Sequence, residues 1–366
     1  MAISIEQAKD RLDVIINKAR VDLYKPIQIA EVLCHSRTES TIDPLSLDTY
    51  RTQSIHWRNS VTRHLTGKAS SSSAQYQHHI WEESAMPPEF LKVLDEENKM
   101  TSGAVERYIY LRYGERQGAV AEIIKVIENG TSDTFQLSVL LKLFETHPGI
   151  RRSIDKAYEI VAYSLFETVV VQSGITIKVS VPEHNIEFLR EFSDLTKVLA
   201  GIDAEHLEWE QQAHIYRVGV TNAADRGLDM WANFGPAVQV KHLSLNRNLA
   251  SSIVEQVETD HIVIVCRDAD AEVIQTVMSQ IGWGRRVRGI VKETHLVDWY
   301  ERCLRGNFRE QLSVPLLRRL TEGFNYEFPQ TKTLTDFIRE RGYFSLHPPE
   351  MWRTQIEISL SSDLAT

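Results

Sequence analysis

The sequence predicts an α/β protein, with a mainly helical region over residues 1–148 followed by an α/β region over residues 149–366. In the first region, apolar residues recur at three- and four-residue spacing, which is typical of amphipathic helices. In the second region, helical runs alternate with short β-branched runs such as HIVIVC (261–266), as in a mixed sheet with helices on both faces. His147-Pro148-Gly149 interrupts both patterns and marks the boundary.

The helices expected in the first region lie at about 5–18, 26–36, 55–66, 87–97, 103–113 and 117–128. Within this region, segment 56–73 has two interpretations. As a recognition helix followed by a winged-helix-like wing, it would direct three basic side chains toward DNA, those of Arg58, Arg63 and Lys68. As an ordinary amphipathic helix, it would pack through its apolar side.

The second region is expected to begin with a helix at 150–172 and a strand at 175–181, followed by a helical insertion at 183–200. The acidic stretch 203–210 is expected to be a solvated helix face. Two strands carrying polar residues follow, around positions 229 and 239. The remaining elements are a helix at 247–258, a strand at 261–266, a helix at 270–281 and a strand at 287–291. Without the insertion, the order is α-β-β-β-α-β.

The composition is that of a soluble globular protein, with 42% hydrophobic and 25% charged residues in a chain of 366. No apolar run approaches the roughly 18–20 residues that span a bilayer, and no secretory signal begins the chain. Three scattered cysteines favour a reduced cytoplasm over a disulfide framework or a zinc site. The net charge of −9 argues against a nucleic-acid partner, but residues 285–319 hold nine basic and four acidic residues. That stretch is either a solvated helical face or a phosphate-contacting surface.

The most informative stretch is GLDMWANFGPAVQVKHLSL (227–245), which has the pattern of a β-hairpin turning at Gly235-Pro236. Gln239 and Lys241 lie two apart on the second strand and therefore share a face. The hairpin can bring Asp229 of the first strand beside them. A carboxylate, an amide oxygen and an ammonium on one edge can hold Mg²⁺ and a phosphate.

This order of elements, with D-x9-Q-x-K on two strands, resembles the PD-(D/E)XK nuclease fold, and the Q-x-K form resembles its Mrr-like branch. The wider sequence resembles the HaeII-type type II restriction endonucleases. Four segments carry that likeness: YKPIQIAEVL (24–33), DRGLDMWANFGPAVQVKHLSL (225–245), HIVIVCRDADAEVI (261–274) and IGWGRRVRGIV (281–291).

The resemblance implies Mg²⁺-dependent cleavage of double-stranded DNA at a short GC-rich palindrome of six base pairs, by a homodimer. A companion DNA methyltransferase is expected, because the host needs protection from such an enzyme. Asp229 would ligate Mg²⁺, and Lys241 would orient the attacking water and offset charge on the phosphorane. Gln239 stands where many relatives have Glu or Asp, so it offers an oxygen without a charge. The helix at 150–172 would supply a further acid, Glu159 in preference to Glu167.

Several alternatives remain open. Asp225 is a weaker alternative for the metal-binding acid, His242 is expected to pack on the opposite face from Lys241, and Asp268-Ala-Asp270 is expected to cap a helix. Further DNA contacts are expected from Arg226, Asn246, Arg247, Arg285 and Arg286. The chain could also be a structure-specific DNA repair nuclease, or a non-cleaving DNA-binding regulator on a degenerate nuclease fold.

Overall fold

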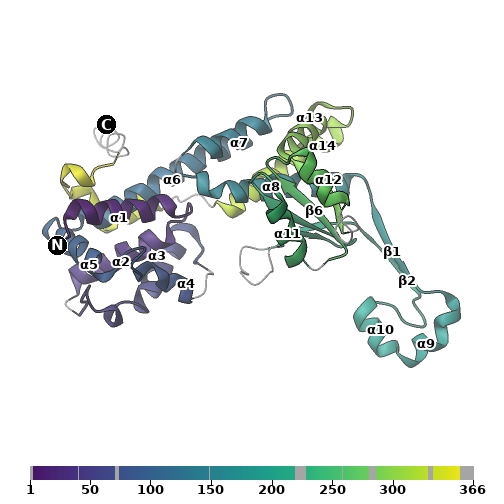
Figure 1. The fold of residues 1–366 in the computed structure, drawn as a ribbon, viewed down its shortest axis with the longest axis horizontal. Coiled ribbons are helices and arrows are strands. Elements are labelled where there is room, and N and C mark those ends of the chain that lie inside the picture. Colours follow the sequence, from purple (N-terminus) through teal and green to yellow (C-terminus); the bar gives the residue numbers. More distant parts are fainter. Residues whose placement is uncertain are drawn as a thin grey trace.

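The computed structural model describes residues 3–39, 41–70, 74–147, 149–218, 228–257, 259–279, 286–328 and 333–354. A helical lobe stands at one end of the molecule, an α/β body lies in the middle, and a slender arm projects from the body on the side away from the lobe (Figure 1). The fold is therefore mixed α/β, as the sequence predicts.

The helical lobe is built from α1 (Ile5–Lys18), α2 (Tyr24–Thr38), α3 (Gln53–Thr66), α4 (Ala74–His78), α5 (Pro88–Met100) and the first half of α6 (Ala104–Glu128). Local signals explain where helices begin: Ser4 and Gln7 form a capping box at α1, and Pro88 occupies the first turn of α5. No strand occurs among the described residues of this lobe. The expected wing after α3 is therefore not found within them, because the helix packs in an all-helical core.

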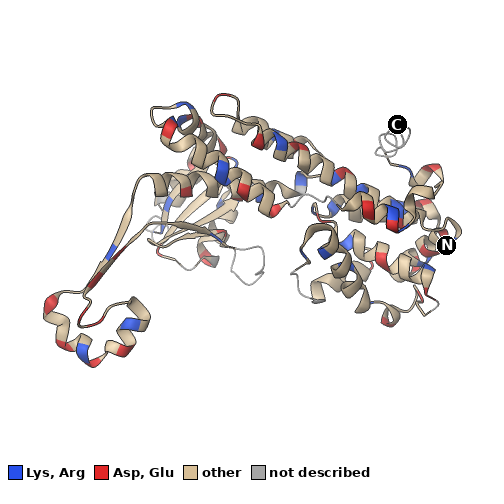
Figure 2. Ribbon diagram, turned by 180° about the vertical axis from the view of Figure 1, so that it is seen from behind, with Lys and Arg blue, Asp and Glu red and all other residues tan. Residues whose placement is uncertain are grey.

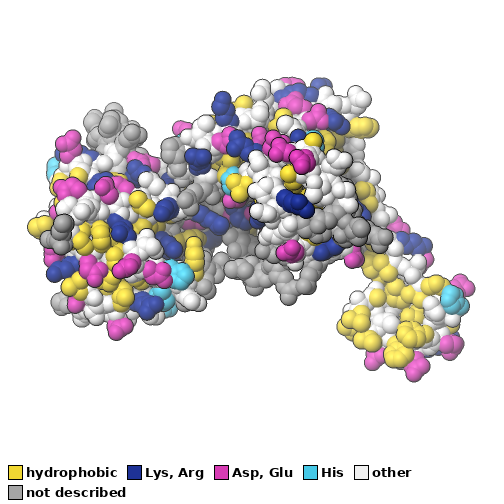
Figure 3. Space-filling view, in the orientation of Figure 1, with side chains coloured by type: hydrophobic (Ala, Val, Ile, Leu, Met, Phe, Trp, Pro, Cys, Tyr) yellow, Lys and Arg dark blue, Asp and Glu magenta, His cyan; other side chains and the backbone are white. Residues whose placement is uncertain are grey.

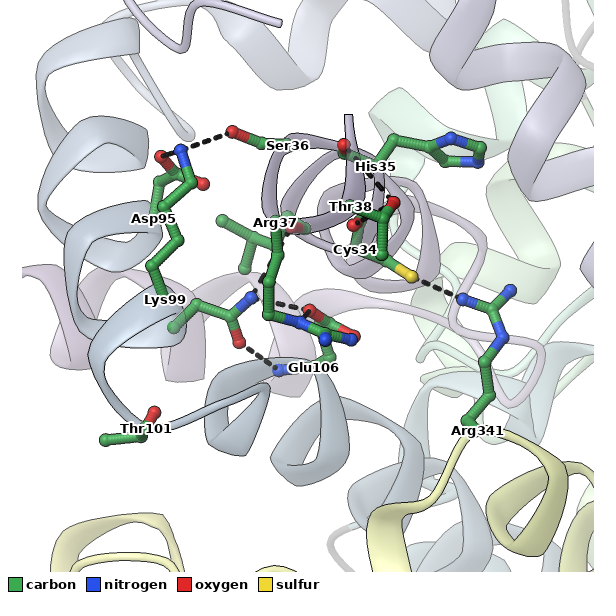
Figure 4. Close-up of polar contacts among 12 residues, drawn as sticks. Cys34, His35, Ser36, Arg37, Thr38, Asp95, Lys99, Thr101, Glu106 and Arg341 are labelled. Carbon is green, nitrogen blue, oxygen red and sulfur yellow. Dashed lines mark hydrogen bonds and ion pairs between the residues drawn. The ribbon is translucent and has the colours of Figure 1, made fainter. Parts of the chain in front are cut away.

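Residues 334–352 return to this lobe. Phe337 and Ile338 of α15 (Leu334–Glu340), together with Tyr343 and Trp352, belong to the same apolar core as α1 and α2. Figure 4 shows the polar contacts beneath them. The buried carboxylate of Glu106 accepts hydrogen bonds from Arg37 at 2.9 and 3.1 Å, from Asn98 at 2.5 Å and from the Tyr343 hydroxyl at 2.5 Å. Residues beyond the boundary at 148 therefore complete the N-terminal lobe.

The body holds a five-stranded sheet in the order β3 (Ile215–Arg217), β4 (Met230–Ala232), β5 (Pro236–Lys241), β6 (His261–Cys266) and β7 (Val287–Lys292). The first three strands are antiparallel, and β5, β6 and β7 are parallel. One face packs against α8 (Ile154–Gln172), α13 (Glu293–Arg305) and α14 (Arg309–Glu327), together with α7 (Leu137–Thr146). The other face packs against α11 (Arg247–Gln256) and α12 (Ala271–Ser279). The sheet is thus covered on both sides.

The arm contains β1 (Thr176–Ser180) and β2 (Glu208–Gln212), which pair only with each other in the described structure. Its tip carries α9 (Ile186–Glu191) and α10 (Ser193–Ala200), which confirms the helical insertion. The strand expected at 175–181 exists, but its place in the main sheet was wrong: neither of its faces is buried, and β3 lies in the sheet instead. The expected helix at 203–210 was also wrong, because Glu208 enters β2 and pairs with Lys178 at 2.7 Å.

Candidate active site

The β4–β5 hairpin forms as expected. Met230 pairs with Val238, and Gly235 adopts a φ of +114° at the turn, a conformation that favours glycine. Because β5 is longer than β4, Gln239 to Lys241 extend beyond the residues of β5 that pair with β4. Asp229, just before β4, lies beside this extension.

A pair of hydrogen bonds fixes the Asp229 carboxylate. Its Oδ2 accepts from the Gln239 side-chain Nε2 at 2.6 Å and from the Val240 backbone N–H at 2.7 Å. Gln239 is only 2% exposed, and its Oε1 has no hydrogen-bond partner among the residues that the structure describes. A buried acceptor left unsatisfied costs about 1–3 kcal/mol. This oxygen therefore points to an electropositive ligand at the site.

Burial raises the pKa of Asp229 to about 6, and the nearby Glu159 carboxylate adds to this rise. The Val240 N–H, Lys241 and Lys156 act in the opposite direction. The Glu159 charge thus acts on a partly buried Asp229, and the Lys241 and Lys156 ammonium groups act on it in the opposite sense. A divalent cation would relieve the repulsion that raises this pKa.

Glu159 comes from the second turn of α8 and is buried. Its two oxygens accept hydrogen bonds from Lys156 at 2.8 and 2.7 Å, and Arg217 of β3 lies 3.7 Å away. Arg217 in turn forms an ion pair of 2.5 Å with Glu327, in the last turn of α14. Glu159 is therefore held between two cations, one of which is anchored by a second acid.

Glu167, the alternative acid on α8, has different hydrogen-bond partners from Glu159. One of its oxygens accepts from the Ile215 backbone N–H at 2.6 Å, and the other contacts His214 at 2.9 Å. These contacts attach α8 to the start of β3. Of the two acids, Glu159 is the one whose charge acts on Asp229.

The donor set fits a hard divalent cation: a carboxylate from Asp229, the free amide oxygen of Gln239 and a carboxylate from Glu159. Among the residues that the structure describes, no group of three or more His, Cys, Asp or Glu could hold a metal. Asp229 and Glu159 are only two acids, so the Gln239 oxygen would be the third protein ligand of this set.

Two of the basic residues expected at DNA are committed to the protein. Arg58 is 1% exposed, and its guanidinium donates to Gln28, Gln77 and Asn59. The guanidinium of Arg286 donates to the backbone carbonyls of three residues, Val254, Val257 and Thr259. The expectation of a DNA contact is corrected at both positions, because neither group is free to reach a phosphate.

The other expected residues are distributed as follows. Arg63 and Arg247 are exposed, whereas the Lys68 ammonium bonds the Tyr326 carbonyl and lies 4.0 Å from that ring's centroid. The Asn246 side chain accepts from the Leu249 N–H and caps α11. Arg226, Arg285 and Asp225 lie outside the described residues.

Two further expectations, for His242 and for Asp268, can be compared with the structure. The His242 side chain pairs with Asp155 at the start of α8, so it makes a polar contact where packing was expected. The Asp268 carboxylate accepts from the Ala269 N–H at 2.8 Å and pairs with Lys292 at 3.3 Å. Neither partner is an amide of α12, so these contacts are not the helix cap that was expected.

Three neighbours of the candidate site were missed from the sequence: Lys156, Arg217 and Glu327. Lys156 could have been found, since it lies three residues before Glu159 and so on the same face of a helix. The pairing of Arg217 with Glu327 joins residues 110 positions apart and leaves no local signal.

The class of protein that fits this mixed sheet and this acid–amide–ammonium site is a nuclease. The chain matches the family model described as HaeII restriction endonuclease over residues 8–343. It is 44% identical over 341 residues to the type II restriction enzyme HaeII of Haemophilus aegyptius, covering 93% of this chain and 97% of that relative. It is 46% identical over 347 residues to the type II restriction enzyme NgoBI of Neisseria gonorrhoeae, covering 94% and 98%. The chain therefore belongs to the HaeII restriction endonuclease family. No solved structure matches it.

Proposed function

We propose that this restriction endonuclease makes Mg²⁺-dependent, sequence-specific double-strand cuts in DNA, with Asp229, Gln239 and Glu159 holding the ion. The observation that carries the proposal is the buried Gln239 Oε1, which has no donor among the described residues and belongs to a side chain bonded to Asp229, whose carboxylate is repelled by the Glu159 charge. Bound there, the ion would polarise the scissile phosphate and activate a water molecule.

The body supports a PD-(D/E)XK core. Leaving out the arm, the chain runs α8, β3, β4, β5, α11 and β6, which is the α-β-β-β-α-β order with β3 as its first strand. The acid of the motif precedes the second strand, and Gln239 and Lys241 share a face of the third. This is the arrangement in which the motif is expected to act.

The side chains divide the work as follows. Asp229 is oriented by the Gln239 amide and the Val240 N–H, so its second oxygen is left for the ion. Lys241 would orient the attacking water and stabilise the negative charge that builds on the phosphate oxygens. Lys156 and Arg217 position Glu159 and reduce its repulsion of Asp229.

The proposed substrate is double-stranded DNA that carries a GC-rich palindrome of six base pairs. We propose that a homodimer cuts it in the cytoplasm. A companion DNA methyltransferase in the same system would protect the host DNA. The exposed Arg63 and Arg247 are proposed phosphate contacts. Figure 3 shows Lys and Arg side chains where the helical lobe meets the body. No helix in the described part of the chain is long and apolar enough to cross a membrane.

The test is a plasmid digest with the purified protein, with and without Mg²⁺, and sequencing of any ends. Discrete Mg²⁺-dependent fragments that share one palindrome at their ends are expected. Cutting confined to branched or flapped DNA, or binding without any cutting, would refute the proposal. Asp229→Ala should abolish cutting, while Glu167→Gln serves as a matched acid variant on the same α8 helix.

A further inference from the structure

Arg217 of β3 lies between two buried acids but bonds only one of them. Its Nη2 pairs with Glu327 of α14 at 2.5 Å, whereas its Nε lies 3.7 Å from Glu159 Oε2. All three side chains are at most 13% exposed. Among the described residues, the buried Arg217 Nε has no hydrogen-bond acceptor. An N–H···O hydrogen bond spans about 2.7–3.2 Å, so this donor stops less than about 1 Å short of the Glu159 carboxylate.

The sheet fixes the backbone of Arg217 at the candidate metal site. In the β3–β4 ladder, Arg217 pairs with Met230, and the next residue, Val218, donates its N–H to the Asp229 carbonyl at 2.9 Å. A shift of the Arg217 side chain alone would therefore bring its Nε onto Glu159. The contact that opposes this shift is the ion pair with Glu327.

A guanidinium bonded to Glu159 would compete with a metal ion for this carboxylate. Lys156 already donates to both Glu159 oxygens, at 2.8 and 2.7 Å, but an ammonium on a flexible stem can move aside. Arginine and carboxylate form planar pairs with two hydrogen bonds, which are harder to displace. A buried arginine that has lost its acid is costly, so Arg217 would bond Glu159 if Glu327 lost its charge.

We propose that Glu327 is a positioning residue for DNA cleavage: it holds Arg217 away from Glu159 and so leaves the Glu159 carboxylate to the metal ion. The inference rests on the proposed function, in which Glu159 is a ligand of that ion. From 3.7 Å, Arg217 still offsets the charge of Glu159 without covering its oxygens. Glu327 acts through Arg217 and touches neither the ion nor the DNA.

The helical lobe holds the end of α14 that carries Glu327. Lys68, which follows α3, donates to the carbonyl of Tyr326, the neighbour of Glu327, and its ammonium lies 4.0 Å from the centroid of the Tyr326 ring. Burial and, after it, the Glu327 charge raise the pKa of Asp22, between α1 and α2, to about 6, while Lys68 acts in the opposite direction. Figure 2 shows both acidic and basic residues where the lobe meets the body. The lobe is therefore part of the support that keeps Glu327 on Arg217.

The experiment measures Mn²⁺ binding to the full chain by calorimetry, without DNA. Glu327→Gln should raise the Mn²⁺ dissociation constant by about tenfold, because Arg217 then bonds Glu159. In an Arg217→Met background, the same Glu327→Gln change should alter the dissociation constant by less than about twofold, because no guanidinium is left to compete. Glu310→Gln, the same change at an acid of α14 whose side chain is 89% exposed, is the matched control and should bind like wild type. Urea melts confirm that each variant is folded.

Cleavage gives a second readout. Glu327→Gln should raise the Mg²⁺ concentration for half-maximal cutting by about tenfold, and saturating Mg²⁺ should restore the rate, because access of the ion and not the chemical step is impaired. Lys68→Met should produce the same change in smaller form, about threefold, because it loosens the end of α14 without removing the Glu327 charge.

Unchanged Mn²⁺ affinity in Glu327→Gln would overturn the proposal. So would an equal loss of affinity in the Arg217→Met background, since Glu327 would then act through its own charge and not through Arg217. An unchanged Mg²⁺ dependence in Lys68→Met would overturn the part assigned to the lobe. A wild type that binds Mn²⁺ but cuts no DNA would refute the proposed function alone, whereas a wild type that binds no Mn²⁺ would overturn both.

Discussion

Replacing Asp229 by Asn should stabilise the metal-free protein while abolishing cleavage. Folding raises the pKa of this acid from its ordinary value of 3.8 to about 6, so the folded state binds the proton more tightly than the unfolded state. The charged form of Asp229 therefore costs stability, increasingly so as pH rises from about 4 to about 6. The full cost is about 3 kcal/mol above pH 7 and about 1.5 kcal/mol at pH 5.

Asn removes this cost without losing the local contacts. Both hydrogen bonds to Asp229 converge on one oxygen, Oδ2, so an amide oxygen can accept both. We expect Asp229→Asn to raise the free energy of unfolding by about 2–3 kcal/mol at pH 8 and by about half as much at pH 5. Urea denaturation in EDTA at both pH values measures this.

Metal should stabilise wild type more than the Asp229→Asn variant. Added Mg²⁺ should stabilise wild type, because a ligand that binds only the folded state favours it, and should have little effect on Asp229→Asn. The reasoning would be refuted if the variant were no more stable than wild type at pH 8 without metal. An equal gain at pH 5 and pH 8 would also refute it, since the gain would then not come from ionisation.

Three further substitutions test the site and the lobe. Lys241→Ala should lower the cleavage rate by about 100-fold or more, with sequence-specific binding in Ca²⁺ retained in gel-shift assays. Lys156→Met removes the ammonium bonded to both Glu159 oxygens and should tighten Mn²⁺ binding by roughly three- to tenfold in calorimetry, because a competing cation is lost. Unchanged Mn²⁺ affinity would show that Glu159 is not a ligand. Arg58→Met should lower the free energy of unfolding by about 2–4 kcal/mol in urea, because Gln28 and Gln77 lose a buried partner. A loss of DNA binding at unchanged stability would restore Arg58 as a base-reading residue.

The β4–β5 hairpin was predictable from the sequence because its signals are local. A glycine turn, two β-prone runs and a two-residue spacing determine which of its side chains share an edge. Glu159 could be proposed from the sequence for a related reason, since helix geometry limits which acids of α8 can point toward the hairpin. The helical insertion at the arm tip also follows from local periodicity.

The errors lie where tertiary context decides. The run at 176–180 is β-prone, but nothing local shows that it pairs with 208–212 in the arm while β3 completes the main sheet. Arg58 has the charge of a DNA contact, yet Gln28 and Gln77 bind it within the lobe. The return of Trp352 to the helical lobe, where it donates to Glu97 at 3.1 Å, links residues 255 positions apart.

The structure also gives a physical reason for a glutamine at position 239. Asp229 is already forced toward protonation by burial and by Glu159, and a third carboxylate at 2.6 Å from Asp229 would repel both. An amide avoids that repulsion and uses its Nε2 to orient Asp229, which leaves its oxygen available to the proposed ion. The negative charge that a glutamate would supply is provided by Glu159, which Lys156 and Arg217 hold in place. The loss of an acid from the motif is thus compatible with a working site, provided that α8 keeps its acid.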